Sequence, residues 1–234
     1  MGSAAVLRDY TVLAGVAGYE ETPYSARLFR DVELLQNQAN FRLNEVDLFA
    51  VAAGPGSFTG LRVGLAAVKA WAEVHRKPVA AISGLHAIAF QFQTDGTPSP
   101  AKGTSGPRYL ASFLDARRGQ IFGAMYASAS AGELALAPAG EETILLPEEF
   151  LANVKQKVGG GRVDFVSSTP EAIPAPLLQK FFPEASANRV SAALAPAIGR
   201  LAFEAARRGE VLDPIRVDAN YVRRSDAEAA WKEA

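Results

Sequence analysis

Gly54-Pro55-Gly56-Ser57-Phe58-Thr59-Gly60-Leu61-Arg62-Val63-Gly64-Leu65 is the stretch that decides the fold of this chain. Residues 48–53, just before it, form an apolar run of strand length, and the residues behind it continue to His75 without proline. The pattern therefore predicts a buried strand, a tight turn and a helix. A glycine-rich turn in this position either cradles an anion on free backbone N–H groups or lets the strand and the helix pack closely.

The turn lacks the residues of the two standard nucleotide-binding loops. A Walker A loop needs a lysine that reaches the phosphates, and this stretch has none. Gly54, Gly56 and Gly60 give only a variant of the dinucleotide fingerprint, in which Pro55 removes one N–H group from the supposed cradle. The next strand ends at Ser83, where an acid that holds the ribose is expected. The residues therefore argue against a nicotinamide cofactor.

Composition sets the broad class of the protein. The chain has 234 residues, 49% of them hydrophobic, which suits one large domain or two small ones with a proper core. The net charge of −1 excludes a broad basic footprint for nucleic acid, so any RNA contact is expected to be shared with a partner. Cysteine is absent, which excludes disulfides and thiolate metal sites. No apolar run reaches membrane-spanning length, and the predicted location is the cytoplasm.

Strand and helix patterns alternate along the chain, which predicts an α/β fold. A polar stretch, 94–107, separates two halves and indicates a lobe boundary, so we expect lobes at 1–100 and 101–234. In the first half the predicted strands are 4–7, 11–16, 48–53 and 78–82, and the predicted helices are 25–40, the helix that follows the glycine turn, and 85–92. In the second half the predicted strands are 109–114, 120–127, 142–146 and 163–166, and the predicted helices are 147–157 and 191–208.

Two helices of the first half carry stripes that allow two interpretations. The helix at 25–40 has an apolar stripe that Phe29 widens, which suits either a core-facing helix or a helix that binds a partner. The helix after the turn has small residues and an indole at spacings of three and four. Because glycine in a helix costs about 1 kcal/mol relative to alanine, this stripe indicates close packing, either within the chain or against another chain.

No catalytic set emerges from the residues. The only histidines, His75 and His86, lie in different predicted elements, so no clustered metal site is expected. Ser57, His86 and Asp115 supply the residue types of a hydrolase triad, but G-P-G-S-F-T-G is not a G-x-S-x-G elbow. The carboxylates show no paired spacing for general acid and base. We therefore predict no catalytic residues and no metal.

The glycine-rich stretch and a second motif, L-D-A-R-R-G-Q-I-F at 114–122, resemble the two signatures of the TsaB (YeaZ) family. Tyr24-Ser25-Ala26-Arg27-Leu28-Phe29 and Tyr221-Val222-Arg223 also fit, so the resemblance covers nearly the whole chain. The family is also titled glycoprotease or peptidase M22-like, after its paralogue TsaD. The residues that match its signature loops are Gly54, Pro55, Gly56, Ser57, Phe58, Thr59, Arg62, Asp115, Arg117 and Arg118.

The resemblance implies an actin-like ATPase fold of two lobes, as in Hsp70, sugar kinases and ribonuclease H. It also implies a role in making threonylcarbamoyladenosine next to the anticodon of ANN-reading tRNAs. In that family TsaD transfers the group, and TsaB is its inactive sister, which pairs with TsaD through two helices of the first lobe. The interface residues that this implies here are Leu28, Phe29, Val32, Leu35, Gly60, Leu61, Gly64, Ala67, Val68 and Trp71.

On this reading the chain is a non-catalytic subunit. Its expected partners are a TsaD-like paralogue, a TsaE-like ATPase, tRNA only through the complex, and a second copy of itself. No cofactor of its own is expected, with ATP or ADP bound only together with TsaD. Two alternatives stay open, a weak ATPase of the actin-like fold and a glycoprotease-like peptidase. Family members begin with a strand and an Asp-Thr-Ser loop that nothing matches here, so the first sheet is expected to be one strand short or completed by a neighbour.

Overall fold

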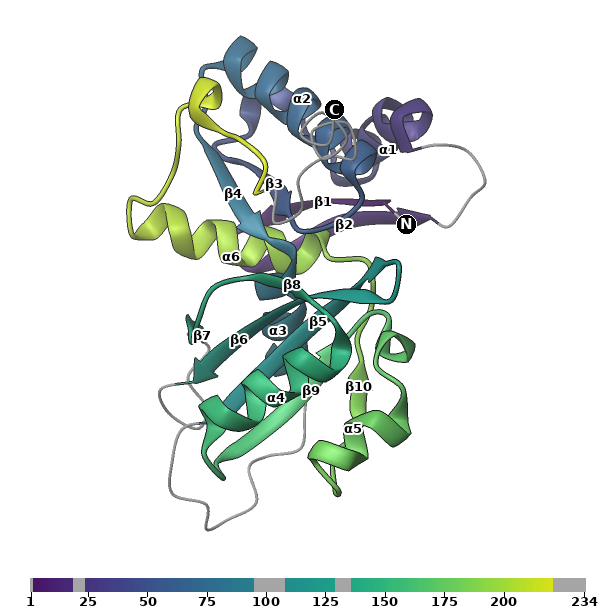
Figure 1. The fold of residues 1–234 in the computed structure, drawn as a ribbon. Coiled ribbons are helices and arrows are strands. Elements are labelled where there is room, and N and C mark those ends of the chain that lie inside the picture. The colour runs from purple at the N-terminus through teal and green to yellow at the C-terminus, as the bar shows by residue number, and fades with distance from the viewer. Residues whose placement is uncertain (1, 19–23, 95–107, 129–135, 221–234) are drawn as a thin grey trace, which may run out of the picture. The chain divides into compact units, whose positions relative to one another are not determined.

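The computed structural model describes residues 2–18, 24–94, 108–128 and 136–220 (Figure 1). Its described residues form two compact units, one with residues up to 87 and from 192 onward, the other with residues 88–191. The last helix thus belongs to the first unit, whereas the division by sequence at residue 100 placed it in the second half. Of the predicted boundary stretch 94–107, only Thr94 is described. Within the described ranges, no helix has the length and apolar character needed to cross a membrane.

Unit 1 contains two strand pairs and the helices that cover them. β1 (Gly2–Arg8) and β2 (Thr11–Gly18) form an antiparallel hairpin, and β3 (Phe49–Gly54) and β4 (Val79–Ser83) form a parallel pair. The helices are α1 (Tyr24–Ala39), α2 (Phe58–His75), the start of α3 (Gly84–Thr94) and α6 (Ala195–Arg207), with short 3-10 turns at Leu43–Glu45 and Pro214–Arg216. In the described chain the two strand pairs are separate sheets.

One hydrophobic cluster of unit 1 lies between β3 and α2. Alternate residues of β3, Phe49 and Val51, are buried against Leu65 and Ala72 of α2, as the period of two in a strand requires. The turn between the two elements matches the prediction. Gly54 has φ +120°, and a Cβ there would lie 2.7 Å from the carbonyl oxygen of Asn220, so this position requires glycine. Ser57 then caps α2 by accepting the N–H of Gly60 at 3.5 Å.

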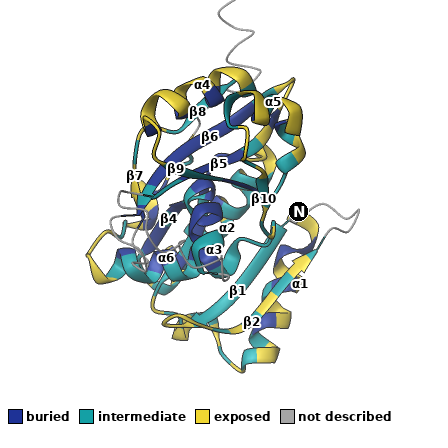
Figure 2. Cartoon of the chain, turned by 90° about the horizontal axis from the view of Figure 1, so that it is seen from below, coloured by how far each residue is buried: buried dark blue, intermediate teal, exposed yellow. Residues whose placement is uncertain are grey.

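Unit 2 is a six-stranded mixed sheet with helices packed on it. Its elements are β5 (Arg108–Arg117), β6 (Gln120–Ser128), β7 (Leu136–Pro138), β8 (Thr143–Leu145), α4 (Pro147–Val158), β9 (Arg162–Ser167), a 3-10 turn at Pro170–Ala172, α5 (Ala175–Phe181) and β10 (Ala187–Arg189). The strand order is β10-β9-β5-β6-β7, and β8 also pairs with β6. Figure 2 shows β5 and β6 largely in the buried colour. Gly123 of β6 leaves the room that the ring of Phe150 from α4 fills.

Most predicted elements are present, and the differences have local causes. The last helix begins at Ala195 instead of residue 191, because Pro196 suits the first turn of a helix. α5, β7 and β10 were not predicted. α5 lies in a proline-rich passage, where Pro174 is its N-cap and Pro176 lies in its first turn without breaking it. The proposed final turn of helix at 226–233 lies outside the described residues.

The Gly64→Ala variant is expected to raise the free energy of unfolding by up to about 1 kcal/mol. A Cβ at Gly64 would meet Val51 at 3.7 Å, an ordinary contact, while alanine removes the entropic cost of glycine inside α2. Urea unfolding measures the change. Gly123→Ala is the matched control and should lose stability, because its new methyl group meets the buried ring of Phe150. A destabilised Gly64→Ala protein would contradict the prediction.

Candidate functional site

The outward side of α2 carries a line of small apolar residues. Ala66, Ala70 and Val74 follow one another at intervals of four, and all three are exposed. Phe29 of α1 packs against α2, with its ring edge-on to Trp71 at 5.9 Å between centroids. The side chain of Phe29 is 67% exposed and that of Val74 is 75% exposed. We call Phe29, Ala66, Ala70 and Val74 the helix-pair surface.

Only one of the ten predicted interface residues is exposed. Leu28 and Leu35 are buried. Phe29 is exposed, and the half-buried members are Val32, Gly60, Leu61, Gly64, Ala67, Val68 and Trp71. Val68 and Trp71 pack against the core of unit 1, and Gly64 lies next to Val51 of β3. The small-residue stripe therefore turns toward the chain's own strands, and a partner interface at these ten residues stays a prediction.

A buried ion pair holds α1 in place beneath the exposed Phe29. Arg27 and Asp31 lie one turn apart and join Nε to Oδ2 at 3.3 Å, with both side chains almost fully buried. Arg27 also donates from Nη2 to the carbonyl oxygen of Gly2 in β1 at 2.9 Å. The guanidinium thus connects α1 to the β1–β2 hairpin. This contact holds in position the helix that carries Phe29.

The first signature loop divides into a buried start and an exposed continuation. Gly54 and Pro55 are buried, whereas Gly56, Ser57, Phe58, Thr59 and Arg62 are exposed. The guanidinium carbon of Arg62 lies 3.9 Å from the centre of the Phe58 ring, which is cation–π geometry. The loop therefore carries an aromatic ring and a positive charge on its outer side.

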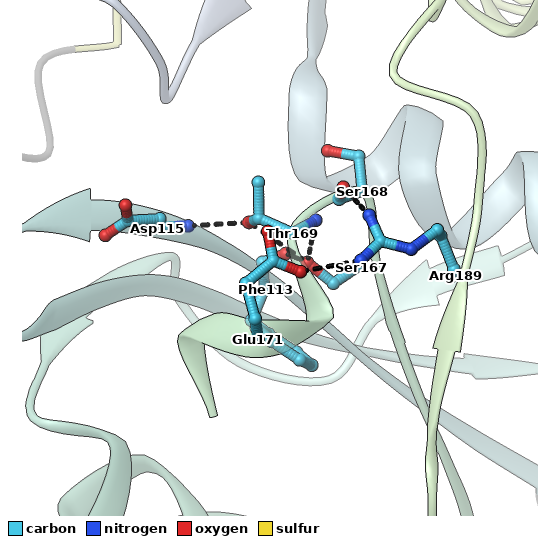
Figure 3. Close-up of polar contacts among 7 residues, drawn as sticks. All are labelled: Phe113, Asp115, Ser167, Ser168, Thr169, Glu171 and Arg189. Atoms are coloured by element: carbon cyan, nitrogen blue, oxygen red, sulfur yellow. Dashed lines mark hydrogen bonds and ion pairs between the residues drawn. The ribbon is translucent and has the colours of Figure 1, made fainter. Parts of the chain in front are cut away.

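The second signature loop belongs to a polar cluster in unit 2 (Figure 3). β5, β9 and β10 run parallel, so their carboxyl ends meet at one edge of the sheet. The N–H of Asp115 donates to Thr169 Oγ1 at 3.0 Å, and Asp115 Oδ1 accepts the N–H of Arg117 at 2.7 Å. Ser167 Oγ donates to the carbonyl oxygen of Phe113 at 2.6 Å and accepts the N–H of Thr169 at 2.9 Å. These hydrogen bonds connect the end of β5 to the residues that follow β9.

Charged groups surround this cluster. Arg189 donates to the carbonyl oxygen of Ser168 at 3.1 Å and to Glu171 Oε2 at 2.7 Å. A backbone hydrogen bond at Glu171 itself, with Arg189 as the lesser cause, lowers the pKa of the Glu171 carboxyl. Arg117 and Arg118 are exposed at the turn of the β5–β6 hairpin, with φ of 62° and 55°. Ligands in α/β sheets often bind at such carboxyl ends, and these arginines would suit an anion.

The residues of the hypothetical triad have separate roles. Ser57 caps α2, and the backbone and carboxylate of Asp115 hold the hairpin. His86 lies in α3, where burial and, to a lesser degree, the positive charge of Arg208 lower its pKa to about 4. The ring of His75 stacks on Phe49. Among the described residues, no three His, Cys, Asp or Glu side chains gather as a metal site.

The Ser167→Ala variant is expected to lose about 1–3 kcal/mol of stability, because it leaves the buried carbonyl of Phe113 without its donor. Ser112→Ala is a matched control: Ser112 is equally buried, and its hydroxyl oxygen has no hydrogen-bond partner among the described residues, so removing it should cost less. Denaturant unfolding of both variants measures the difference. Equal losses in the two variants would contradict the role given to Ser167.

Comparison with known proteins places the chain in a family. Residues 21–161, more than half of the chain, match the family model TsaD, described as tRNA N6-adenosine threonylcarbamoyltransferase. The chain belongs to the TsaD family. A TsaB protein of Bacillus subtilis, described as a tRNA threonylcarbamoyladenosine biosynthesis protein, is 31% identical over 122 residues, which cover 52% of this chain and 48% of that protein. The predicted relationship to TsaB is confirmed.

Other members share either sequence or fold with the chain. A tRNA N6-adenosine threonylcarbamoyltransferase of Brucella ovis is 39% identical over 114 residues, which cover 43% of this chain and 31% of that protein. This TsaD family chain thus spans half or less of the length of the curated relatives it matches. The structure of YeaZ from Pseudomonas aeruginosa superposes with a TM-score of 0.64 at 24% identity over 89% of each chain.

A second Pseudomonas aeruginosa structure, of an uncharacterized protein similar to peptidase YeaZ, gives a TM-score of 0.70 at 22% identity over 94% of each chain. At these identities the two structures establish the fold alone. The actin-like fold of the TsaD family, predicted from the signature loops, is therefore confirmed.

Proposed function

We propose that this chain is a non-catalytic subunit that pairs with a TsaD-like enzyme in the threonylcarbamoylation of adenosine next to the tRNA anticodon. The relatives named for this modification support the assignment to this pathway, and the exposed helix-pair surface supports pairing with a partner there. A TsaE-like ATPase and tRNA then meet this chain only within the complex. A second copy of the chain competes for the same surface when the partner is absent.

The helix-pair surface is the observation that carries the proposal. Two exposed alanines four residues apart, Ala66 and Ala70, leave the outward side of α2 shallow there, so another helix can approach its backbone. Phe29 of α1, which packs on Trp71 of α2, is a large exposed ring, the kind of residue that dominates binding energy when a partner buries it. The buried Arg27–Asp31 pair keeps the ring on a rigid helix, which lowers the entropic cost of binding.

The decisive experiment is a pull-down with the TsaD-like protein of the same organism, followed by reconstitution of tRNA modification with and without this chain. Both proteins are expected to co-purify at equal amounts, and modification is expected to need both. Phe29→Ala should weaken pairing by at least tenfold, since an aromatic anchor is lost. Tyr10→Ala is the control, because Tyr10 is also exposed but packs on Phe203 of α6.

A second candidate function is anion or nucleotide binding at the polar cluster of unit 2, which the exposed Arg117 and Arg118 favour. Calorimetry with ATP and magnesium separates the two candidates. The pairing proposal predicts little or no heat of binding with the chain alone, whereas a weak ATPase predicts saturable binding that Arg117→Ala reduces. A digest of casein by the purified chain tests the peptidase alternative, and no cleavage is expected.

A further inference from the structure

The first residues of β5 and β9 place two arginines side by side at one end of the sheet of unit 2. Arg108 and Arg162 are register partners in neighbouring parallel strands, so their side chains leave the sheet on the same face. Both reach the same carboxylate oxygen: Asp164 Oδ2 lies 2.6 Å from Nε of Arg108 and 3.7 Å from Nε of Arg162. We call Arg108 and Arg162 the arginine pair.

The arginine pair carries one positive charge more than its carboxylate neutralises. In the described part of the chain, Asp164 is the only acid that forms an ion pair with either arginine. Like charges on neighbouring strands repel each other, so a second anion at this place would stabilise the arrangement. Both contacts to Asp164 use Nε, and the terminal Nη groups of the two guanidiniums have no hydrogen-bond partner among the described residues. The pair therefore has donors left for another anion.

Two contacts hold Arg108 in a fixed orientation. Its guanidinium carbon lies 5.7 Å from the centre of the Phe92 ring in α3, which is a cation–π contact. Its ion pair with Asp164 is largely shielded from water, since the two side chains are only 21% and 18% exposed. An arginine that is already ordered loses little entropy on binding, and its planar fork matches the oxygens of a phosphate. The arginine pair thus has the chemistry of a phosphate-binding group.

The loop between α4 and β9 extends this positive end of unit 2 (Figure 1). Gly159 and Gly160 have φ of 56° and 91°, and a Cβ at either would meet no atom within 4 Å, so the loop backbone is open to an approaching group. Lys155 and Lys157 lie in the last turn of α4, are exposed and form no ion pair with any described residue. Lysines there also suit the negative end of the helix dipole, so by themselves they indicate no ligand. With the arginine pair, however, they put four cations around one open loop.

We propose that the phosphodiester backbone of an RNA strand binds at this end of unit 2, with one phosphate on the arginine pair and further phosphates at Lys155 and Lys157. Cations spread over two strand starts and a helix end suit a chain of phosphates, whereas a single free phosphate would use the arginine pair alone. The site lies at the amino ends of β5 and β9, opposite to the polar cluster at their carboxyl ends. The inference rests on the proposed function for the identity of the RNA, a tRNA, and not for the position of the site.

Four cations make an RNA contact that is weak by itself. Each phosphate contact with a single strand adds about −0.7 to the slope of the logarithm of the binding constant against the logarithm of the salt concentration, so four contacts give about −2.8. The affinity then falls about 20-fold between 50 and 150 mM salt. The chain alone therefore binds RNA measurably at low salt, and at physiological salt the contact serves only together with a partner.

Fluorescence anisotropy with a fluorescein-labelled transcript of an ANN-reading tRNA tests the proposal on the full chain alone at 50 mM salt. The parent chain is expected to bind. Arg162→Gln should weaken binding at least about fivefold and make the salt slope shallower by about 0.7, the value of one phosphate contact. In this variant Asp164 keeps its closer partner Arg108, so the chain stays folded. Lys157→Gln changes an exposed side chain and should weaken binding in the same way.

Lys180→Gln is the matched control. Lys180 is also an exposed cation of unit 2 with one ion pair, to Glu148 at 2.8 Å, but it lies away from the arginine pair in α5. Its loss should leave RNA binding unchanged. An equal loss in Lys180→Gln would show an effect of net charge and overturn the site, as would unchanged binding by Arg162→Gln and Lys157→Gln or no binding by the parent chain.

A competition experiment distinguishes the two sources of phosphate. Inorganic phosphate at 1 mM and constant ionic strength should leave the RNA bound, because it replaces only one of several contacts. Displacement of the RNA would assign the arginine pair to free phosphate and overturn the RNA assignment. Because the TsaD-like partner is absent from these measurements, their result is independent of pairing at the helix-pair surface. A failed pull-down with intact RNA binding would overturn the proposed function alone.

Discussion

The Ala70→Arg variant is expected to lose at least about 100-fold in affinity for the TsaD-like partner while it stays folded. Ala70 lies in the middle of the helix-pair surface and is exposed, so a longer side chain meets solvent in the free protein. Surface substitutions of this kind change stability by about 0.5 kcal/mol or less. In the complex, the same guanidinium would be buried among apolar residues without an ion-pair partner, which is costly. A 100-fold loss corresponds to about 2.7 kcal/mol of binding free energy.

Surface plasmon resonance with the immobilised partner gives the affinity, and circular dichroism checks the fold. Ala152→Arg is the matched control, because Ala152 is an exposed alanine on α4 in the other unit. This control is expected to bind as the parent chain does. Unchanged binding by Ala70→Arg would remove the helix-pair surface from the proposed function, and loss of binding by both variants would show an effect of charge alone.

The sequence predicted the elements around the glycine turn because their signals are local. An apolar run, a glycine with a required φ and a serine cap lie within ten residues. Each of them determines the backbone conformation at its own position. The grouping of α6 with unit 1 depends on contacts between segments far apart in the chain, such as Arg200 with Tyr10. Spacing within one helix contains no information on such contacts. The division of the chain at residue 100 therefore placed this helix in the second half.

The candidate interface shows the same limit at the level of single residues. Spacing identified α2 as a helix with a small-residue stripe, but a helix that packs on a sheet also uses small residues for close approach. Gly64 lies on Val51, so its stripe is explained within the chain, and the exposed Ala66 and Ala70 lie on the adjacent side. Their spacing of four is visible in the sequence. Which side of α2 faces β3 is set by tertiary packing, and the spacing of residues in the sequence does not predict it.

His86 is expected to make the stability of unit 1 depend on pH between about 6.5 and 4. Burial, with Arg208 as the lesser cause, lowers its folded-state pKa from 6.5 to about 4. Below pH 6.5 the unfolded chain takes up a proton at this residue that the folded chain refuses, so the free energy of unfolding falls as the pH falls. The stabilisation is complete above about pH 6.5, and its loss ends near pH 4, where both states bind the proton. The shift corresponds to a total of about 3 kcal/mol.

Urea unfolding of the parent chain and of His86→Gln at pH 7 and at pH 4.5 measures the contribution of His86. The change in the free energy of unfolding between the two pH values is compared between the two proteins, so that contributions of the other titrating groups cancel. The parent chain is expected to lose about 2–3 kcal/mol more than the variant over this interval. Arg208→Gln separates the two causes. Since burial is the larger cause, removing the guanidinium should reduce the pH dependence only in part. If Arg208→Gln abolished the dependence, charge repulsion would be its main source, and if His86→Gln kept the full dependence, the group responsible would lie elsewhere.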